Sequence, residues 1–127
     1  TANAGASQYY KGGVTAYANQ TKENILGVEK DVLLKFGAVS KEVAEQMSEG
    51  VKKALNTDYS IATTGIAGLE GGSEEKPVGT VWISVASDKN KVAEKHFFPT
   101  TRDNFIERVG NQALLMLINL INEENPF

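Results

Sequence analysis

A glycine-rich stretch between two predicted strands constrains the fold of this chain more than any other feature. A strand is predicted over 59–64 and another over 80–87. The loop between them contains five glycines, Gly65, Gly68, Gly71, Gly72 and Gly79. Glycine is costly to order, and long loops without secondary structure are uncommon in compact domains. A plain surface connection and a functional loop both explain the stretch. Because consecutive glycine N–H groups can form an anion-binding concavity, we favour the functional loop.

Composition narrows the function classes. The chain has 127 residues, enough for one domain with its own core, and a net charge of −3 without a basic run, which gives no indication of a nucleic-acid partner. It has no cysteine and one histidine, His96, so disulfides, a cysteine nucleophile and a multi-histidine metal centre are excluded. No apolar run could span a bilayer and no signal peptide is visible. We therefore expect a cytoplasmic protein without a membrane partner.

The first half of the chain predicts a strand and three helices. The strand is expected over 13–18, and short helices are expected over 22–26 and 32–36. A long helix is expected to begin at Ser40, because apolar residues recur after it at spacings of three and four. These residues are Val43, Ala44, Met47, Val51, Ala54 and Leu55.

The second half predicts a hairpin and a long helix. Strands over 80–87 and 92–98 flank a polar turn. Thr100 or Thr101 caps the last helix. Its buried stripe is expected to contain Phe105, Ile106, Val109, Ala113, Leu117, Leu120 and Ile121. So wide an apolar face must be covered on more than one side, by other elements or by a second copy in a dimer. The order of elements predicts a layered α/β fold with a mixed sheet, in which one hairpin strand is antiparallel.

Candidate chemical groups follow the predicted strands, where open α/β sheets bind ligands. Lys22 is expected on the first turn of a short helix, where a desolvated amine could have a lowered pKa and take a proton from a hydroxyl. Thr64 ends the second strand. A solvated lysine and a capping threonine are the plain alternatives. Arg102, at a helix start, could bind a carboxylate or phosphate, although a surface pair with Glu74 or Asp103 would also explain it. Together these groups suggest a small anionic substrate such as a nucleotide.

Several blocks of residues, in chain order, resemble the CinA C-terminal domain family. The blocks are Gly5-Ala6-Ser7, Tyr17-Ala18-Asn19-Gln20-Thr21-Lys22, Gly37-Ala38-Val39-Ser40, Thr64-Gly65-Ile66-Ala67-Gly68, Gly71-Gly72-Ser73 and Lys76-Pro77-Val78-Gly79-Thr80-Val81. They extend over nearly the whole chain. The resemblance therefore implies that 1–127 is a CinA C-terminal-like amidohydrolase domain, with the fold of a three-layer α/β/α sandwich.

Characterised members of that family are nicotinamide mononucleotide deamidases. The resemblance implies a metal-independent amidohydrolase without a cofactor, which converts nicotinamide mononucleotide to nicotinate mononucleotide and ammonia. The family uses a serine nucleophile, a lysine base and a supporting threonine, and the last two match Lys22 and Thr64. Main-chain N–H groups of the glycine loop would face the developing charge or the phosphate. The substrate-binding residues implied in this way are Tyr17, Asn19, Gly65, Gly68, Gly71, Gly72 and Arg102.

The sequence departs from the family pattern in three places. The Glu-Ser-Cys-Thr-Gly-Gly block that supplies the serine is absent, which implies that the nucleophile, first strand and first helix lie upstream of Thr1. Leu69-Glu70 replaces the usual proline, and Phe98-Pro99-Thr100-Thr101-Arg102 replaces Phe-x-Gly-Asp-Arg. A non-catalytic nucleotide-binding or interaction module of the same fold is therefore the alternative, and amide hydrolysis of another substrate is a third hypothesis.

Overall fold

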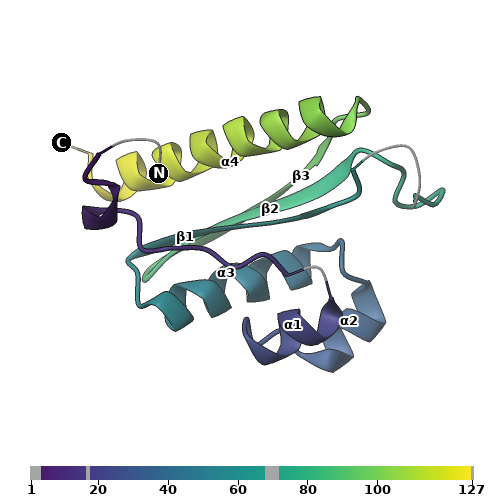
Figure 1. Cartoon of the computed structure of the whole chain (residues 1–127), viewed down its shortest axis with the longest axis horizontal. Coiled ribbons are helices and arrows are strands. Elements are labelled where there is room, and N and C mark those ends of the chain that lie inside the picture. The colour runs from purple at the N-terminus through teal and green to yellow at the C-terminus, as the bar shows by residue number, and fades with distance from the viewer. Residues whose placement is uncertain (1–3, 17, 68–71, 127) are drawn as a thin grey trace.

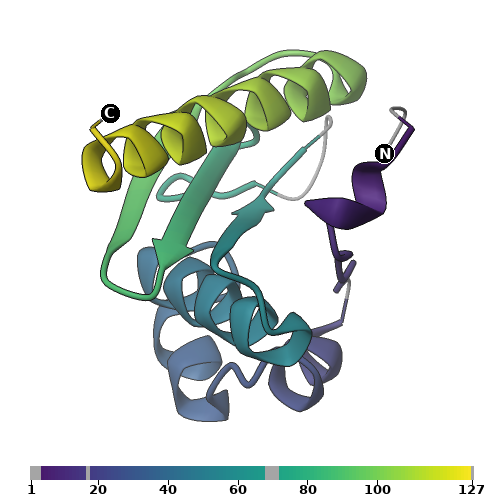
Figure 2. The same cartoon turned by 90° about the vertical axis from the view of Figure 1, so that its left-hand side faces the viewer.

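The computed structural model describes residues 4–16, 18–67 and 72–126. Its elements are η1 (Ala6–Gln8), α1 (Asn19–Asn24), α2 (Lys30–Phe36), α3 (Lys41–Leu55), β1 (Tyr59–Gly65), β2 (Thr80–Ser87), β3 (Lys91–Phe97) and α4 (Arg102–Glu124). The strands form one sheet in the order β1-β2-β3. The sheet lies between α4 on one face and α3 on the other, with α1 and α2 beyond α3 (Figures 1 and 2). The α/β class is thereby confirmed.

Strand β2 is the centre of the hydrophobic core on the α4 side. Its residues alternate between the two faces of the sheet, so Val81, Ile83 and Val85 all point toward α4, as predicted. They pack against Phe105, Val109, Ala113, Met116 and Leu120 of α4. One member of the predicted helix stripe is wrong, because 58% of the Ile106 side chain is exposed. The buried stripe of α4 passes through Met116 and leaves Ile106 on the outer face.

The outer face of α4 carries the apolar surplus that the sequence predicts. Four large apolar residues there are more than half exposed, namely Ile106, Leu114, Leu115 and Ile118. The expected dimer would cover such a face, and it stays a prediction.

The face of the sheet toward α3 is polar at its centre. Ser48 of α3 and Ser84 of β2 are fully buried, and their Oγ atoms are 2.7 Å apart. The Ser48 hydroxyl donates to the carbonyl of Glu45 at 3.0 Å, so Ser84 donates to Ser48. Ser60 of β1 donates to the Ser48 carbonyl at 2.7 Å. These small side chains fill the layer without leaving a buried side-chain polar atom unpaired in the described residues.

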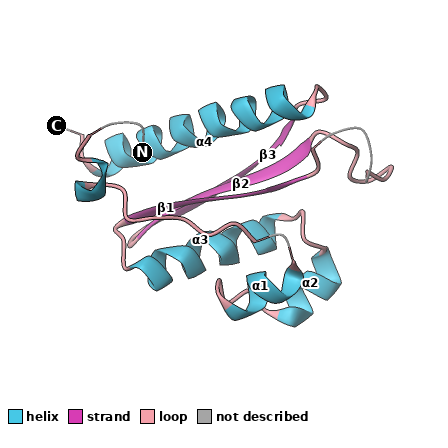
Figure 3. Ribbon diagram, viewed as in Figure 1, coloured by secondary structure: helices cyan, strands magenta, loops and turns pink. Residues whose placement is uncertain are grey.

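The strand expected over 13–18 is wrong for the residues described there. Residues 11–16 are not part of any helix or strand (Figure 3). Strand-forming side chains need a neighbouring strand to pair with, and in the described residues β1 pairs only with β2. Val14 and Ala16 pack instead against the core cluster beneath the sheet. Both strand pairings are antiparallel, so the described sheet is purely antiparallel. The expectation of a mixed sheet is wrong for the described strands.

The predicted caps of the two long helices are confirmed. The Ser40 hydroxyl accepts from the backbone N–H of Val43 at 3.2 Å, which begins α3. Of the two threonines proposed for α4, Thr101 is the cap and accepts from the N–H of Asn104 at 3.3 Å. Within the described ranges, no helix has the length and apolar character needed to cross a bilayer.

Two helix-interior glycines differ in the space around them. A Cβ built on Gly50 of α3 would lie 1.6 Å from the carbonyl oxygen of Leu26, so the chain that follows α1 can approach α3 only at a glycine. A Cβ built on Gly110 of α4 would meet nothing within 4 Å. Gly50 is therefore required for packing, whereas Gly110 is a helix weakness without a packing role.

We expect the same substitution to have opposite effects at these two positions. Gly110→Ala should raise the free energy of unfolding by up to about 1 kcal/mol, because alanine favours a helix over glycine. Gly50→Ala should lower it by at least about 3 kcal/mol, because the methyl group overlaps a backbone oxygen. Urea denaturation measures both. A Gly50→Ala protein as stable as the parent would contradict the close contact with Leu26.

Candidate functional site

The carboxyl end of β1 meets the start of β2 and the first turn of α4. Gly65 pairs with Val81, and a Cβ on Gly65 would lie 2.9 Å from a methyl group of Val81 and 3.0 Å from the ring of Phe105. A larger residue would not fit there. The N–H of Gly79 donates to the carbonyl of Ile66 at 2.7 Å and closes the base of the glycine loop. The predicted site residues Thr64 and Gly65 thus lie in a tightly packed corner.

The segment 36–38, which contains the last residue of α2 and the first two residues of the connection to α3, receives three side-chain hydrogen bonds in succession. Its first carbonyl accepts from Nζ of Lys76 at 2.6 Å. Its second accepts from the hydroxyl of Ser40 at 2.9 Å, and its third accepts from Oγ1 of Thr64 at 2.8 Å. The three donors come from the β1–β2 loop, the N-cap of α3 and the end of β1. This connection therefore fixes Thr64 relative to the loop and to two helices.

Lys22 is buried, with 7% of its surface exposed. Helix α1 extends from Asn19 to Asn24, so Lys22 lies in its last turn. We expected this lysine in the first turn. Its Nζ donates to the carbonyl of Ala16 at 3.0 Å. Burial lowers the pKa of Lys22 below the ordinary lysine value, because desolvation disfavours the charged form. In the part of the chain that the structure describes, no carboxylate forms an ion pair with it.

Lys22 and Thr64 are each hydrogen-bonded to a residue that packs against the same hydrophobic cluster. The cluster consists of Leu26, Val28, Leu33, Val43, Met47 and Ala62. Ala16 and Ala38, whose carbonyls accept from Lys22 and Thr64, both pack against it. Each of the two side chains is bonded to a backbone carbonyl, and no hydrogen bond between them occurs among the described residues. A direct contact between Lys22 and Thr64 stays a prediction.

Two other predicted site residues are exposed at helix starts. Asn19 is the first residue of α1, whose N-cap is Ala18. Arg102 is the first residue of α4, and it forms no ion pair with Glu74 or Asp103 in the described residues. The surface pairs that we weighed for Arg102 are therefore absent from the described structure.

The described part of the glycine loop includes one more predicted residue. A Cβ on Gly72 would lie 2.5 Å from the backbone nitrogen of Val78, so two parts of the loop touch at Gly72. The remaining predicted residues, which lie outside the described residues, are Tyr17, Gly68 and Gly71.

Sequence reasoning missed Ser40 and Lys76 as hydrogen-bond donors to residues 36–38. Both stand in blocks that carry the family resemblance, which was the available signal. Periodicity identified Ser40 only as a helix cap. It gave no reason to place Lys76, a lysine in a loop, against the end of a helix 40 residues earlier.

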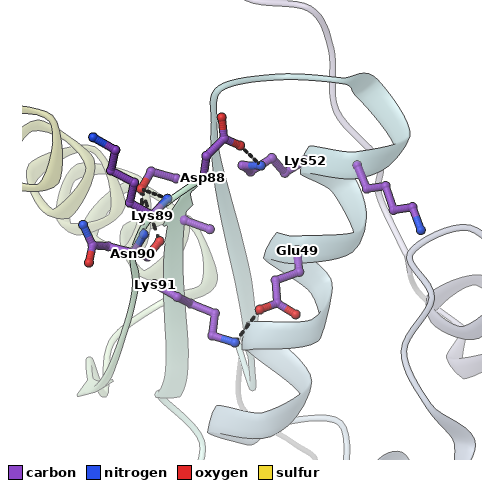
Figure 4. Close-up of a pocket in the computed structure, with 9 residues that line it drawn as sticks. Glu49, Lys52, Asp88, Lys89, Asn90 and Lys91 are labelled. Carbon is purple, nitrogen blue, oxygen red and sulfur yellow. Dashed lines mark hydrogen bonds and ion pairs between the residues drawn. The ribbon is translucent and has the colours of Figure 1, made fainter. Parts of the chain in front are cut away.

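A pocket of about 260 Å³ lies at the other end of the sheet, where β1 begins (Figure 4). It is lined by Glu49, Lys52, Lys53, Ala86, Ser87, Asp88, Lys89, Asn90 and Lys91. Lys52 pairs there with Asp88, and Lys91 pairs with Glu49. Because Lys52 and Lys91 are each paired with a carboxylate, they attract an anion less strongly than unpaired lysines would. Within the described ranges, no group of three or more acidic or histidine side chains could hold a metal ion.

Comparison with known proteins decides the family. The sequence matches the family model of the CinA C-terminal domain over residues 1–121. The chain belongs to the CinA C-terminal domain family. It is 44% identical over 118 residues to a CinA-like protein of Leptospira biflexa, covering 92% of this chain and 28% of that protein. It is 48% identical over 114 residues to a CinA-like protein of Salinibacter ruber, covering 90% and 28%. The chain thus spans less than a third of these CinA-like relatives.

Solved CinA structures have the same fold. A CinA superfamily protein from Escherichia coli superposes with a TM-score of 0.88 at 30% identity, covering 94% of this chain and 69% of that one. A competence/damage inducible protein from Agrobacterium tumefaciens superposes with a TM-score of 0.80 at 36% identity, covering 83% and 65%. The described helices and antiparallel sheet therefore match the CinA superfamily.

The hydrogen bond that holds Thr64 can be tested by stability. Thr64 is 8% exposed, so removal of its hydroxyl should leave the Ala38 carbonyl without a partner. We expect Thr64→Val to lower the free energy of unfolding by about 1–3 kcal/mol, and Thr64→Ser to retain most of the stability. Chemical denaturation of both variants compares them. Equal stability of the valine and serine variants would show that this hydrogen bond contributes nothing.

Proposed function

We propose that this domain belongs to a nicotinamide-nucleotide amidohydrolase, which hydrolyses the carboxamide of nicotinamide mononucleotide to nicotinate mononucleotide and ammonia. Membership of the CinA family supports the proposal. The observation that carries it is the buried amine of Lys22, whose pKa is lowered by burial and whose hydrogen-bond partner is a backbone carbonyl. Lysines are almost never buried unless they are paired, so a buried lysine with a lowered pKa is a candidate general base.

In the proposed reaction, a serine supplied by the longer protein attacks the carboxamide carbon while the neutral amine of Lys22 accepts the hydroxyl proton. The C–N bond then breaks, and the Lys22 ammonium returns that proton to the leaving nitrogen, so that ammonia departs. Water cleaves the resulting serine ester in the same way. Lys22 takes a proton from the water and gives it to the serine oxygen. The carboxylic acid that is left on the ring then loses its proton to solvent and becomes a carboxylate.

The corner around Thr64 would serve the substrate in this reaction. The Thr64 hydroxyl would support the serine, and the backbone N–H groups of Gly65 and Gly72 would face the developing oxyanion or the phosphate. Arg102 is the first residue of α4. It lies at the same end of the sheet, since Phe98 and Pro99, shortly before it in the chain, pack closely against Gly79. A guanidinium there suits a phosphate group.

The proposal predicts that the full-length protein releases ammonia from nicotinamide mononucleotide. Lys22→Met keeps an apolar side chain of similar length but no base, so kcat should fall by about 10²-fold or more. Lys30→Met, at an exposed lysine of α2, is the matched control and should keep the parent rate. Ammonia release measures all three proteins. Normal turnover of Lys22→Met would refute the role of Lys22 as base.

The pH dependence of the rate follows from the same lysine. Only the neutral amine accepts a proton, so kcat should rise with pH and level off above the pKa of Lys22. Because burial lowers that pKa, the plateau should begin below pH 10.5, the ordinary lysine value. If the parent protein binds the nucleotide but releases no ammonia, the domain is instead a nucleotide-binding module of the same fold.

A further inference from the structure

We propose that Lys76 is a positioning residue, which ties the described glycine segment, residues 72–79, to the same stretch of backbone that accepts the hydrogen bond of Thr64. It acts through the hydrogen bond from its ammonium to the carbonyl of Phe36. The catalytic consequence rests on the proposed function, whereas the structural tether does not. Lys76 is distinct from the residues that we expect to touch the substrate.

The segment that Lys76 holds is a compact turn. The N–H of Ser73 donates to the carbonyl of Lys76 at 2.9 Å, and the N–H of Lys76 donates to the Ser73 hydroxyl at 3.1 Å. Gly72 lies so close to Val78 that a Cβ would be 2.5 Å from its backbone nitrogen. Gly72 and Lys76 are therefore parts of one unit, so fixing the lysine also fixes the glycine.

The base of the segment is held by the sheet, whereas its far part is held by Lys76. At the base, Gly79 donates to the carbonyl of Ile66 at 2.7 Å and accepts from the N–H of Phe98 at 2.8 Å. In the described chain, the hydrogen bond to Phe36 is the one that ties residues 72–76 to another part of the molecule. Without it, the turn would be attached at the base alone.

The acceptor suits an ammonium group. Phe36 ends α2, where backbone carbonyls lack partners within the helix and a cation is electrostatically favoured. Gly37 leaves the necessary room, because a Cβ there would lie 2.9 Å from Nζ of Lys76. Two residues after Phe36, the carbonyl of Ala38 accepts from Thr64. Lys76 therefore fixes the turn to the same short connection that fixes Thr64.

A displaced turn would change the position of the Gly72 N–H relative to Thr64. If that N–H faces charge that develops during the reaction, its displacement weakens binding of the transition state more than binding of the substrate. Loss of the tether should then lower kcat and leave KM nearly unchanged. Displacements of about 1 Å are sufficient for rate losses of up to 10²-fold.

The test compares Lys76→Met, Lys76→Arg and a control, Lys95→Met, at an exposed lysine of β3, in the full-length protein. Hydrogen exchange of the Ser73 and Lys76 amides reports the tether. We expect exchange about 10-fold faster in Lys76→Met, parent-like exchange in the control, and substantial recovery in Lys76→Arg, which keeps a charged donor. With nicotinamide mononucleotide as substrate, kcat of Lys76→Met should fall at least about 10-fold, with recovery in Lys76→Arg.

Unchanged exchange in Lys76→Met would overturn the tether. Faster exchange together with an unchanged kcat would overturn the positioning role. A parent protein that does not turn over nicotinamide mononucleotide would overturn the proposed function, while the exchange of the two amides would still decide the tether.

Discussion

The hydrogen bonds to residues 36–38 hold together the end of the molecule where the candidate site lies. Side chains from three separate elements donate to these carbonyls, which belong to the exposed Phe36 and the half-buried Gly37 and Ala38. Lys76 lies in the β1–β2 loop, Ser40 caps α3, and Thr64 is the last residue but one of β1. Hydrogen bonds to one short stretch of backbone can therefore fix the position of the glycine segment relative to the end of β1, although the two are not paired in the sheet.

The two ends of the sheet differ in the contacts that they make. At the end where β1 begins, the carboxylate of Glu124 accepts from Ser87, Asn90 and Tyr59 and joins the last helix to the hairpin turn. These hydrogen bonds lower the pKa of the Glu124 carboxyl group. Such compensated polar contacts stabilise the fold. At the opposite end, Gly65 and Gly79 are closely packed and the buried Thr64 hydroxyl donates to the carbonyl of Ala38. This is the end where we propose that the substrate binds.

Much of the fold was predictable because it depends on local patterns. The alternation of Val81, Ile83 and Val85 defined a buried strand face, and the caps at Ser40 and Thr101 defined two helix starts. The strand over 13–18 was wrong because strand propensity cannot show whether a partner strand is present. The exposure of Ile106 depended on which turn of α4 contacts the sheet, a tertiary property.

The site was predictable only in part. Position at the ends of predicted strands and the family resemblance both selected Lys22 and Thr64, and desolvation was expected to lower the pKa of Lys22. How deeply the fold buries this amine was not visible in the sequence. The role of Lys76 could not be found from spacing, because its partner is the end of a helix far earlier in the chain. Contacts of this kind exist only once α2, β1 and the loop are packed together.

The proposed location of the nucleotide site can be tested by an NMR titration. Full-length protein labelled with ¹⁵N is titrated with nicotinamide mononucleotide while the backbone amides are observed. We expect saturable shifts at Thr64, Gly65 and Gly72, and none at the turn between β2 and β3. Shifts confined to that turn, beside the pocket at the other end of the sheet, would contradict the claim.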